Sequence, residues 1–329
     1  MSRKTIEVEH LSKVYGSTTA IEDIHFSVDA GEIIGFLGPN GAGKTTTMRI
    51  LAGYLPATAG TAKVAGYDVH KQSMAVRRNI GYLPEAPPLY PDMTIESFLW
   101  FVAKIKGIKA KERRRQVYNA MARCQLLSRK DTIIRKLSKG YRQRVGIAQA
   151  IVHEPPVIIL DEPTVGLDPR QIIEVRNLIK SLAGDHTIIL STHILPEASM
   201  VCDRVTIINR GKVVTSNTPN NLQAQLESSS GYEVEVGGDA DLILPVLSKI
   251  AGVVRITVAE SPLYKHPERH LLQIACASNS EPGKEIATAI IQQELELHEM
   301  RRTRPTLEDV FLELTTTEEK LFSVNSQQS

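Results

Sequence analysis

The sequence is poor in cysteine and has no long uninterrupted hydrophobic run. Its 329 residues include three cysteines, Cys124, Cys202 and Cys276, which lie far apart and show none of the close spacings of a metal site. We interpret them as isolated thiols in a reducing compartment. No apolar run approaches the roughly 20 residues that cross a bilayer, and the first residues carry no signal-peptide core. We therefore expect a soluble, cytoplasmic chain that reaches a membrane only through a partner.

An excess of charge of one sign is also absent. The chain carries 39 Lys and Arg against 37 Asp and Glu, a net charge of +2, so no strong signal for binding a polyanion is present. A basic run between Lys109 and Arg123 is interpreted as a solvated helix face, and no nucleic-acid partner is expected. The length favours about two domains, and 42% hydrophobic residues are enough for a substantial core.

What the sequence does contain is a glycine-rich loop between a short apolar strand pattern and a helix. Residues 38–45, Gly-Pro-Asn-Gly-Ala-Gly-Lys-Thr, fit the phosphate-loop pattern G-x-x-x-x-G-K-[ST]. Glycines let backbone N–H groups approach phosphate oxygens, and the following helix adds its positive N-terminal end. In this pattern Lys44 reaches the β- and γ-phosphates and the Thr45 hydroxyl ligates Mg²⁺. The loop predicts a nucleotide-binding protein.

Two further apolar segments end in polar side chains. Residues 157–160 precede Asp161 and Glu162, and residues 187–192 precede His193. Both segments have the composition of strands buried on both faces, and ligands of parallel sheets lie beyond the carboxyl ends of the strands. Asp161 is then placed to hold Mg²⁺ through water, Glu162 to face an attacking water, and His193 to sense the γ-phosphate. The structural alternatives are a pair of acids and a hydrogen-bonded histidine with no role in catalysis.

Other features are ambiguous when taken alone. Ser138 is a natural N-cap of a helix, and Gly140 permits a close backbone approach, so a second anion could bind there. The spacing around Tyr15 favours strand packing over stacking on a base. Glu85 lies between a strand end and a predicted helix, whose aromatic residues, Phe98, Trp100 and Phe101, are expected in the core and not at a cofactor.

Taken in order, these motifs resemble the ATP-binding subunit of ABC transporters over about residues 4–220. The resemblance identifies residues 38–45 as Walker A, 158–161 as Walker B, 137–141 as the signature segment and 166–168 as the D-loop. It makes Tyr15 the adenine-stacking aromatic. It implies that the catalytic residues are Glu162, His193 and Lys44, and that the Mg²⁺ ligands are Thr45, Asp161 and Glu85. It implies that the nucleotide is bound by Tyr15, Gly38, Pro39, Asn40, Gly41, Ala42, Gly43, Lys44, Thr45, Thr46, Glu85, Ser138, Gly140 and Asp168.

The resemblance implies a Mg²⁺-dependent ATPase that works as a dimer, expected to be a homodimer. Two subunits would sandwich ATP, each site being closed by Ser138 and Gly140 of the other protomer, and hydrolysis would drive a membrane permease on the cytoplasmic face. Lys139 and Tyr141 stand where the family's commonest signature has Gly and Gln, and Glu85 stands where it usually has Gln. These departures resemble ABC-2-type exporter ATPases, including drug-export and gliding-motility-type subunits. The alternative function is a soluble, non-transport ABC ATPase acting on a macromolecular complex.

The expected fold is α/β: a P-loop NTPase (ABC ATPase) domain at 4–222 with a parallel core sheet, an N-terminal antiparallel β subdomain, and a helical subdomain at about 86–152. Beyond residue 225 the predicted order is β-α-β-β-α-β. This order indicates a small C-terminal α+β domain of ferredoxin-like type at 230–314, with a helix beginning at Pro305. The polar residues 315–329 are expected to be a disordered tail.

Overall fold

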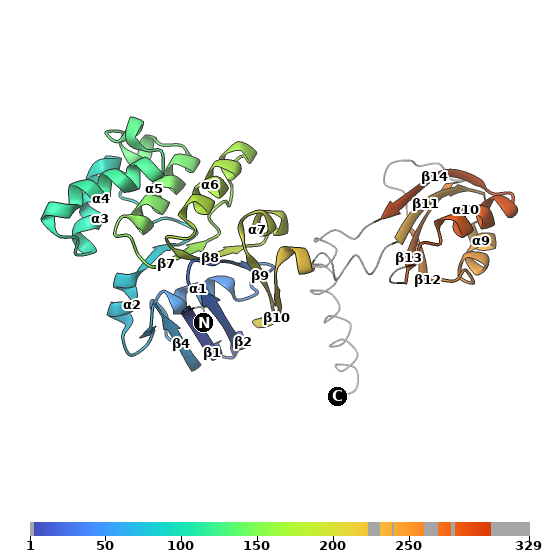
Figure 1. Cartoon of the computed structure of the whole chain (residues 1–329), viewed down its shortest axis with the longest axis horizontal. Coiled ribbons are helices and arrows are strands. Elements are labelled where there is room, and N and C mark those ends of the chain that lie inside the picture. The colour runs from blue at the N-terminus through green and yellow to red at the C-terminus, as the bar shows by residue number, and fades with distance from the viewer. Residues whose placement is uncertain (1–2, 223–230, 239, 260–268, 278–279, 304–329) are drawn as a thin grey trace. The chain divides into compact units, whose positions relative to one another are not determined.

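The chain forms two units, residues 1–219 and 220–329, in a computed structural model (Figure 1). The structure describes residues 3–222, 231–238, 240–259, 269–277 and 280–303. The helix expected from Pro305 and the tail expected at 315–329 lie outside the described residues. In the part that is described, no helix combines the length and apolarity needed to cross a membrane.

The first unit is built on two sheets. A four-stranded antiparallel sheet has the order β2-β1-β4-β5, and a six-stranded sheet has the order β10-β9-β3-β8-β7-β6. The antiparallel strands are β1 (Lys4–Tyr15), β2 (Thr18–Asp29), β4 (Ala59–Val64) and β5 (Tyr67–Asp68). The strands of the larger sheet are β3 (Ile33–Leu37), β6 (Ile80–Leu83), β7 (Val157–Asp161), β8 (Thr187–Thr192), β9 (Arg204–Asn209) and β10 (Lys212–Asn217).

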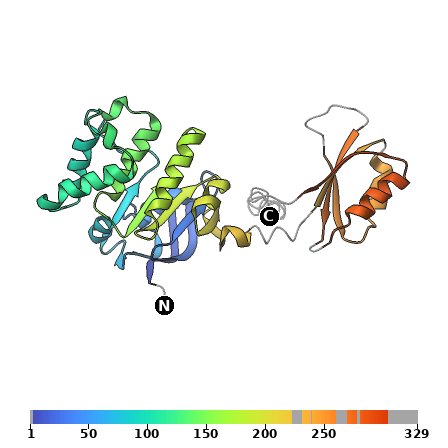
Figure 2. The same cartoon turned by 45° about the horizontal axis from the view of Figure 1, so that its top comes forward.

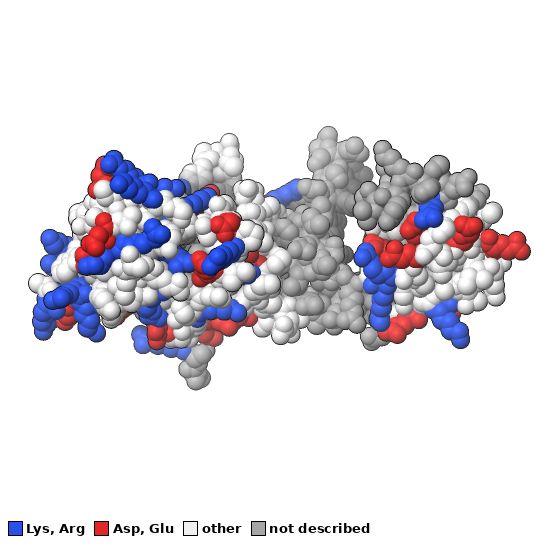
Figure 3. Space-filling view, turned by 90° about the horizontal axis from the view of Figure 1, so that it is seen from above, with Lys and Arg blue, Asp and Glu red and all other residues white. Residues whose placement is uncertain are grey.

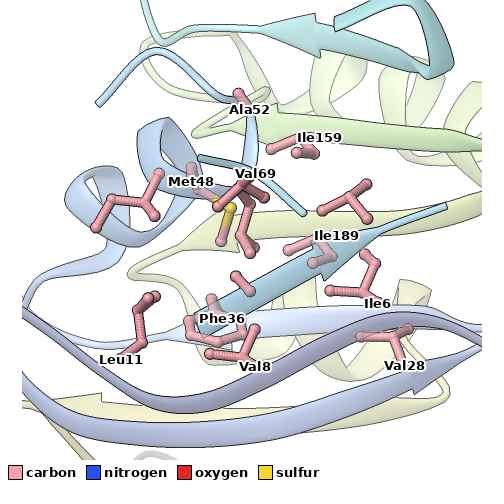
Figure 4. Close-up of a cluster of buried hydrophobic side chains, with 14 of the residues drawn as sticks. Ile6, Val8, Leu11, Val28, Phe36, Met48, Ala52, Val69, Ile159 and Ile189 are labelled. Atoms are coloured by element: carbon pink, nitrogen blue, oxygen red, sulfur yellow. The ribbon is translucent and has the colours of Figure 1, made fainter. Parts of the chain in front are cut away.

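The centre of the larger sheet is parallel. β3, β7 and β8 are runs of mostly β-branched and apolar residues, and every residue in them is buried. Such runs suit strands covered on both faces, as the sequence predicted. Helix α1 (Lys44–Leu51) packs between the two sheets. Its Met48 lies in one core with Val8 of the antiparallel sheet and Phe36 and Ile189 of the parallel sheet (Figure 4).

Helices gather at one end of the first unit. This helical part contains α3 (Ile95–Ile105), α4 (Ala110–Arg123) and α5 (Lys139–Ile151), with 3₁₀ turns at Leu127–Arg129 and Ile134–Lys136 (Figure 1). The hydroxyls of Thr94 and Ser138 cap α3 and α5. The remaining helices of this unit are α2 (Ser73–Asn79), α6 (Pro169–Leu182) and α7 (Leu195–Val201).

The expectation that the aromatic residues of α3 lie in the core is confirmed for Phe98, wrong for Phe101, and met only in part by Trp100, which is partly exposed. Phe98 and Leu99 are buried, but Phe101 is 36% exposed and Ile105 is 67% exposed. A surface helix buries only one stripe of its side chains. Phe101 and Ile105 lie off that stripe, so α3 presents apolar surface outside the core.

The second unit is an antiparallel sheet with two helices. Its elements follow the order β11 (Gly231–Gly237), α9 (Ala240–Leu247), β12 (Val253–Ala259), β13 (Arg269–Cys276), α10 (Gly283–Gln292) and β14 (Glu296–Thr303). The strands pair in the order β12-β13-β11-β14. Figure 2 shows α10 along one face of this sheet, where its Ile286 packs with Val234 and Leu272.

One carbonyl at the start of β6 joins the helical part to the parallel sheet. The backbone oxygen of Ile80 accepts hydrogen bonds from Lys106 Nζ at 3.0 Å and from His153 Nε2 at 2.9 Å. Lys106 follows α3, and His153 follows α5. Burial lowers the pKa of Lys106 to about 8. Burial, together with the nearby Lys106 charge, lowers the pKa of His153 to about 3.

The stability of the first unit should therefore fall in acid. The pKa of His153 lies below its usual 6.5 in the folded state, so the unfolded chain takes up a proton first as the pH drops below 6.5. Because of His153, we expect the free energy of unfolding to fall by about 2 kcal/mol from about pH 7 to pH 5. His153→Gln keeps an N–H donor for Ile80, does not titrate, and should lose this share of the pH dependence.

The measurement is urea unfolding at several pH values, followed by the fluorescence of Trp100, the single tryptophan. His25→Gln, at an exposed position, is the matched control and should keep the wild-type profile. An unchanged acid profile in His153→Gln would remove His153 as its cause.

Candidate functional site

Parallel pairing brings the predicted motifs to one edge of the sheet. β8 lies between β3 and β7, with Leu37 opposite Thr192 and Asp161 opposite Ser191. The phosphate loop follows β3, Glu162 follows β7 and His193 follows β8. Glu85 comes two residues after the end of β6, which pairs in parallel with β7. The polar groups that follow all four strands therefore lie at the same edge of the sheet.

A cavity of about 220 Å³ opens at this edge. It is lined by Ala20, Pro39, Asn40, Gly41, Ala42, Gly43, Lys44, Thr45, Thr46, Glu85, Glu162, Val165 and His193. Most of the residues that the sequence nominated thus meet around one space. Gly38 and Asp161 do not line it, but they hydrogen-bond to Lys44 and Thr45, which do. Ala20 and Val165 are additions that no sequence signal had pointed to.

The loop conformation depends on its glycines. Gly43 has a φ of +104°, and a Cβ on it would lie 2.7 Å from the backbone oxygen of Ala20. A Cβ on Gly38 would lie 2.2 Å from the backbone oxygen of Ile208. The first backbone bond of α1 runs from Thr47 N to Gly43 O, so the N–H groups of residues 44–46 face the open N-terminal end. Such an end attracts anions, and the loop therefore fits a nucleotide phosphate chain.

A buried cation, a carboxylate and an imidazole lie in a row beside the loop. Lys44 is 6% exposed, and its Nζ donates to the backbone oxygen of Gly38 at 2.6 Å. The same Nζ lies 3.4 Å from Glu162 Oε1, while Glu162 Oε2 lies 2.9 Å from His193 Nδ1. Glu162 Oε1 accepts no hydrogen bond from any described residue. Glu162 therefore lines the cavity with one carboxylate oxygen that has an ion-pair partner but no hydrogen-bond donor.

Asp161 is held by two hydroxyl groups. Ser191 Oγ donates to Asp161 Oδ1 at 2.6 Å, and Thr45 Oγ1 donates to the same oxygen at 3.2 Å. Ser191 Oγ also accepts the backbone N–H of Glu162 at 2.9 Å. Hydroxyl and carboxylate oxygens are the ligands that Mg²⁺ prefers, so Thr45 and Asp161 fit the metal role that the sequence suggested. Burial, aided by the charge of Asp161, raises the pKa of neighbouring Tyr82 to about 12 and keeps it neutral.

Ser191 is a site residue that sequence reasoning missed. The sequence pattern predicts it only as a residue of a buried strand. The available signal was its polarity at the end of an apolar run, next to His193. Its function depends on the register that sets it opposite Asp161, and register is a property of the sheet.

Three predicted residues lie outside the cavity of their own chain. Ser138 Oγ accepts the backbone N–H of Tyr141 at 3.4 Å, at the N-terminus of α5. Asp168 Oδ1 accepts the N–H of Gln171 at 2.9 Å, at the N-terminus of α6. Gly140 faces Gln171, whose Oε1 would lie 2.5 Å from a Cβ at that position. The three residues thus gather where α5 and α6 begin.

Tyr15 also lies apart from the cavity. It ends β1 and is 46% exposed, with Lys13 Nζ 5.1 Å from the centre of its ring. Its exposure does not favour strand packing, which the spacing alone had suggested. An exposed ring face has room for a stacked base, and its contact with adenine stays a prediction.

Comparison with known proteins gives consistent matches. The ABC transporter family matches residues 21–165. The linearmycin resistance ATP-binding protein LnrL of Bacillus subtilis is 30% identical over 94% of this chain and 98% of its own length. The daunorubicin resistance ATP-binding protein DrrA3 of Streptomyces coeruleorubidus is 33% identical over 96% of this chain and 97% of its own. A solved ATP-binding subunit of an ABC transporter covers 67% of this chain and 92% of its own, at 34% identity and a TM-score of 0.61.

The geometry predicts a catalytic defect for Ser191→Ala. The change removes one hydrogen bond to the Asp161 carboxylate and leaves the buried N–H of Glu162 without its acceptor. A buried hydrogen bond to a charged group contributes about 1.5–3 kcal/mol. We therefore expect the rate of ATP hydrolysis to fall about tenfold or more, with a higher Mg²⁺ requirement.

Steady-state ATPase assays over a Mg²⁺ titration measure both effects. Ser199→Ala, which removes a hydroxyl bonded only to the α7 backbone, is the matched control. A Ser191→Ala protein with the wild-type rate and Mg²⁺ requirement would show that the hydroxyl does not support the site.

Proposed function

This chain belongs to the ABC transporter family and is an ATPase subunit that powers a membrane permease, and we propose the following roles for its residues. The phosphate loop, Gly38 to Thr46, holds the ATP phosphates, with Lys44 on the β- and γ-phosphates. Thr45 and Asp161, which hydrogen-bond to each other, would hold Mg²⁺, and Glu85 of the cavity lining would be a further carboxylate ligand; the ion would neutralise charge on the phosphates. Tyr15 stacks on the adenine.

The observation that carries the hydrolytic mechanism is the Oε1 atom of Glu162, which is ion-paired with Lys44 but accepts no hydrogen bond from the described residues. It is buried on the wall of the cavity, while Oε2 is held by His193. A carboxylate oriented in this way can take the proton of an attacking water. Lys44 Nζ lies 3.4 Å from the same Oε1 atom and so places a positive charge beside the base. His193 fixes the direction of the carboxylate and stands where it can sense the γ-phosphate.

Glu162→Gln tests this assignment. The amide is nearly the same size but cannot accept the proton, so hydrolysis should fall at least about a hundredfold while ATP binding is kept. A protein that binds ATP and does not turn it over should accumulate as an ATP-bound dimer. Single-turnover assays and gel filtration with and without ATP measure the two effects.

The matched control is Glu9→Ala, an exposed carboxylate on β1. Full ATPase activity in Glu162→Gln would remove Glu162 from the mechanism.

The dimer is part of the proposal. Ser138, Gly140 and Asp168 do not line the cavity of their own chain, and the N-terminus of α5 can bind an anion. In a symmetric pair of subunits each such N-terminus faces the phosphate loop of the other copy. ATP bound between two copies then holds the pair together, and hydrolysis releases it.

The permease contact is proposed at a second cavity, of about 580 Å³, which shares Glu85 and Val165 with the nucleotide cavity. Its other lining residues include Pro87, Leu89 and Pro91, an apolar and conformationally restricted segment. We call it the docking groove. A permease segment bound there touches the same carboxylate that lines the nucleotide cavity, which couples the two sites.

Glu85→Ala tests the coupling. Loss of the carboxylate should raise the Mg²⁺ concentration needed for hydrolysis and reduce transport per ATP hydrolysed. Transport and ATPase rates of the chain assembled with its permease give the ratio, again with Glu9→Ala as control. Unchanged ATPase rate, Mg²⁺ dependence and transport would contradict a role for Glu85.

We propose an exporter of ABC-2 type as the transporter. Relatives that match almost the full length are named for resistance to linearmycin and daunorubicin, and export is the transport direction that such resistance calls for. The chain then works on the cytoplasmic face of the cell membrane. Co-purification with membranes and a permease supports this function, whereas co-purification with ribosomes favours the alternative, a soluble ABC ATPase.

A further inference from the structure

The helical part carries another groove, of about 860 Å³. It shares no lining residue with the nucleotide cavity or the docking groove. It runs between α3 and α4. Its rim holds Lys111, Arg114, Arg115 and Lys130 together with the aromatic side chains of Trp100 and Tyr118. We call it the cationic groove. Figure 3 shows Lys and Arg gathered at the end of the first unit that Figure 1 assigns to α3 and α4.

Three of the four positive charges of this groove have no ion-pair partner among the described residues. Lys111, Arg114 and Arg115 are exposed, and in the described part of the chain none of them forms an ion pair. Lys130 lies 3.7 Å from Glu96, the only carboxylate that lines the groove. The groove therefore has four cations against one anion, within a chain whose net charge is +2. Its ligand should be an anion.

The arrangement along α4 is that of a single helix stripe. Lys111, Arg114, Arg115 and Tyr118 follow the spacing i, i+3, i+4, i+7, which places them on one side of a helix. The interpretation of the basic run as a merely solvated face explains the charges. It does not explain why an exposed tyrosine, 57% accessible, continues the stripe.

The floor of the groove is apolar. Val117 and Met121 of α4 line it and are buried, and Trp100 of α3 lines it and is partly exposed. Trp and Tyr combined with Lys and Arg are typical of side chains at a membrane–water boundary, where rings and aliphatic stems face lipid and the polar tips face headgroups. A small inorganic anion would use the rim and leave the floor uncovered. An amphiphilic anion uses both.

The cationic groove and the docking groove are neighbours. Pro91 lines the docking groove and Glu96 lines the cationic groove, and they are five residues apart. The segment between them is fastened to the chain around Lys130 by the backbone bond from Glu96 N to Lys130 O. A permease bound in one groove therefore brings the membrane surface toward the other.

We propose that the cationic groove binds the headgroup region of an anionic phospholipid in the membrane that holds the permease. The phosphate and any further anionic group lie against Lys111, Arg114 and Arg115, and the glycerol and upper acyl region lie on Trp100, Val117 and Met121. The proposal rests on the proposed membrane partner. It adds a contact with the lipid beside the permease, through which membrane composition acts on recruitment of the ATPase.

The test uses the full chain and vesicles, without the permease. Vesicles of phosphatidylcholine with or without phosphatidylglycerol are titrated into the protein, and Trp100, the single tryptophan, reports from inside the groove. With anionic vesicles only, we expect its emission to shift to the blue and to be quenched by brominated lipid. Added salt should weaken both effects. Each cation near an anionic surface contributes about fivefold in affinity, so the triple variant Lys111→Gln, Arg114→Gln, Arg115→Gln should bind about a hundredfold more weakly.

The matched control is Lys63→Gln, Lys71→Gln, Arg78→Gln, which removes three exposed cations of the same unit outside both grooves. Equal binding by the two triple variants, or anionic vesicles that leave Trp100 emission unchanged, overturns the proposal. So does a Trp100 response to polyglutamate but not to vesicles, which would make the groove a site for an acidic protein segment. ATPase activity in solution is measured on the same samples. A protein that hydrolyses ATP but does not bind the vesicles contradicts the lipid proposal alone, because the proposed function is tested by Glu162→Gln.

Discussion

The candidate site is assembled by the parallel hydrogen bonding of β3, β8 and β7. Because the three strands run in the same direction side by side, the segments that follow them emerge at one edge. Their side chains are buried on both faces, so the strands cannot slide without exposing apolar surface. The same register places Ser191 opposite Asp161 and lets one hydroxyl bind both the carboxylate and the backbone of Glu162.

Much of the candidate site could be predicted because its signals are local. The phosphate loop, Glu162 and His193 each follow an apolar segment directly. The change from apolar to polar residues marks the end of a buried strand in the sequence. Ser191 could not be found in this way, because its partners are chosen by strand register. Nor could the exposure of Phe101 and Ile105, since a continuous apolar run does not show which stripe of a helix faces the core.

The helical part connects the chemistry to the outside of the molecule. Glu85 lines both the nucleotide cavity and the docking groove, and the chain that leaves this groove at Pro91 reaches the cationic groove at Glu96. Three concave surfaces are thus arranged along a short stretch of sequence.

The carbonyl of Ile80 ties this arrangement to the sheet. Two donors from separate helices, Lys106 and His153, converge on one oxygen at the first residue of β6, and the other end of this short strand leads to Glu85. These two bonds make one backbone atom the shared anchor of both helices on the sheet. Only three residues of β6 and Pro84 separate this anchor from Glu85, at the wall of the ATP cavity.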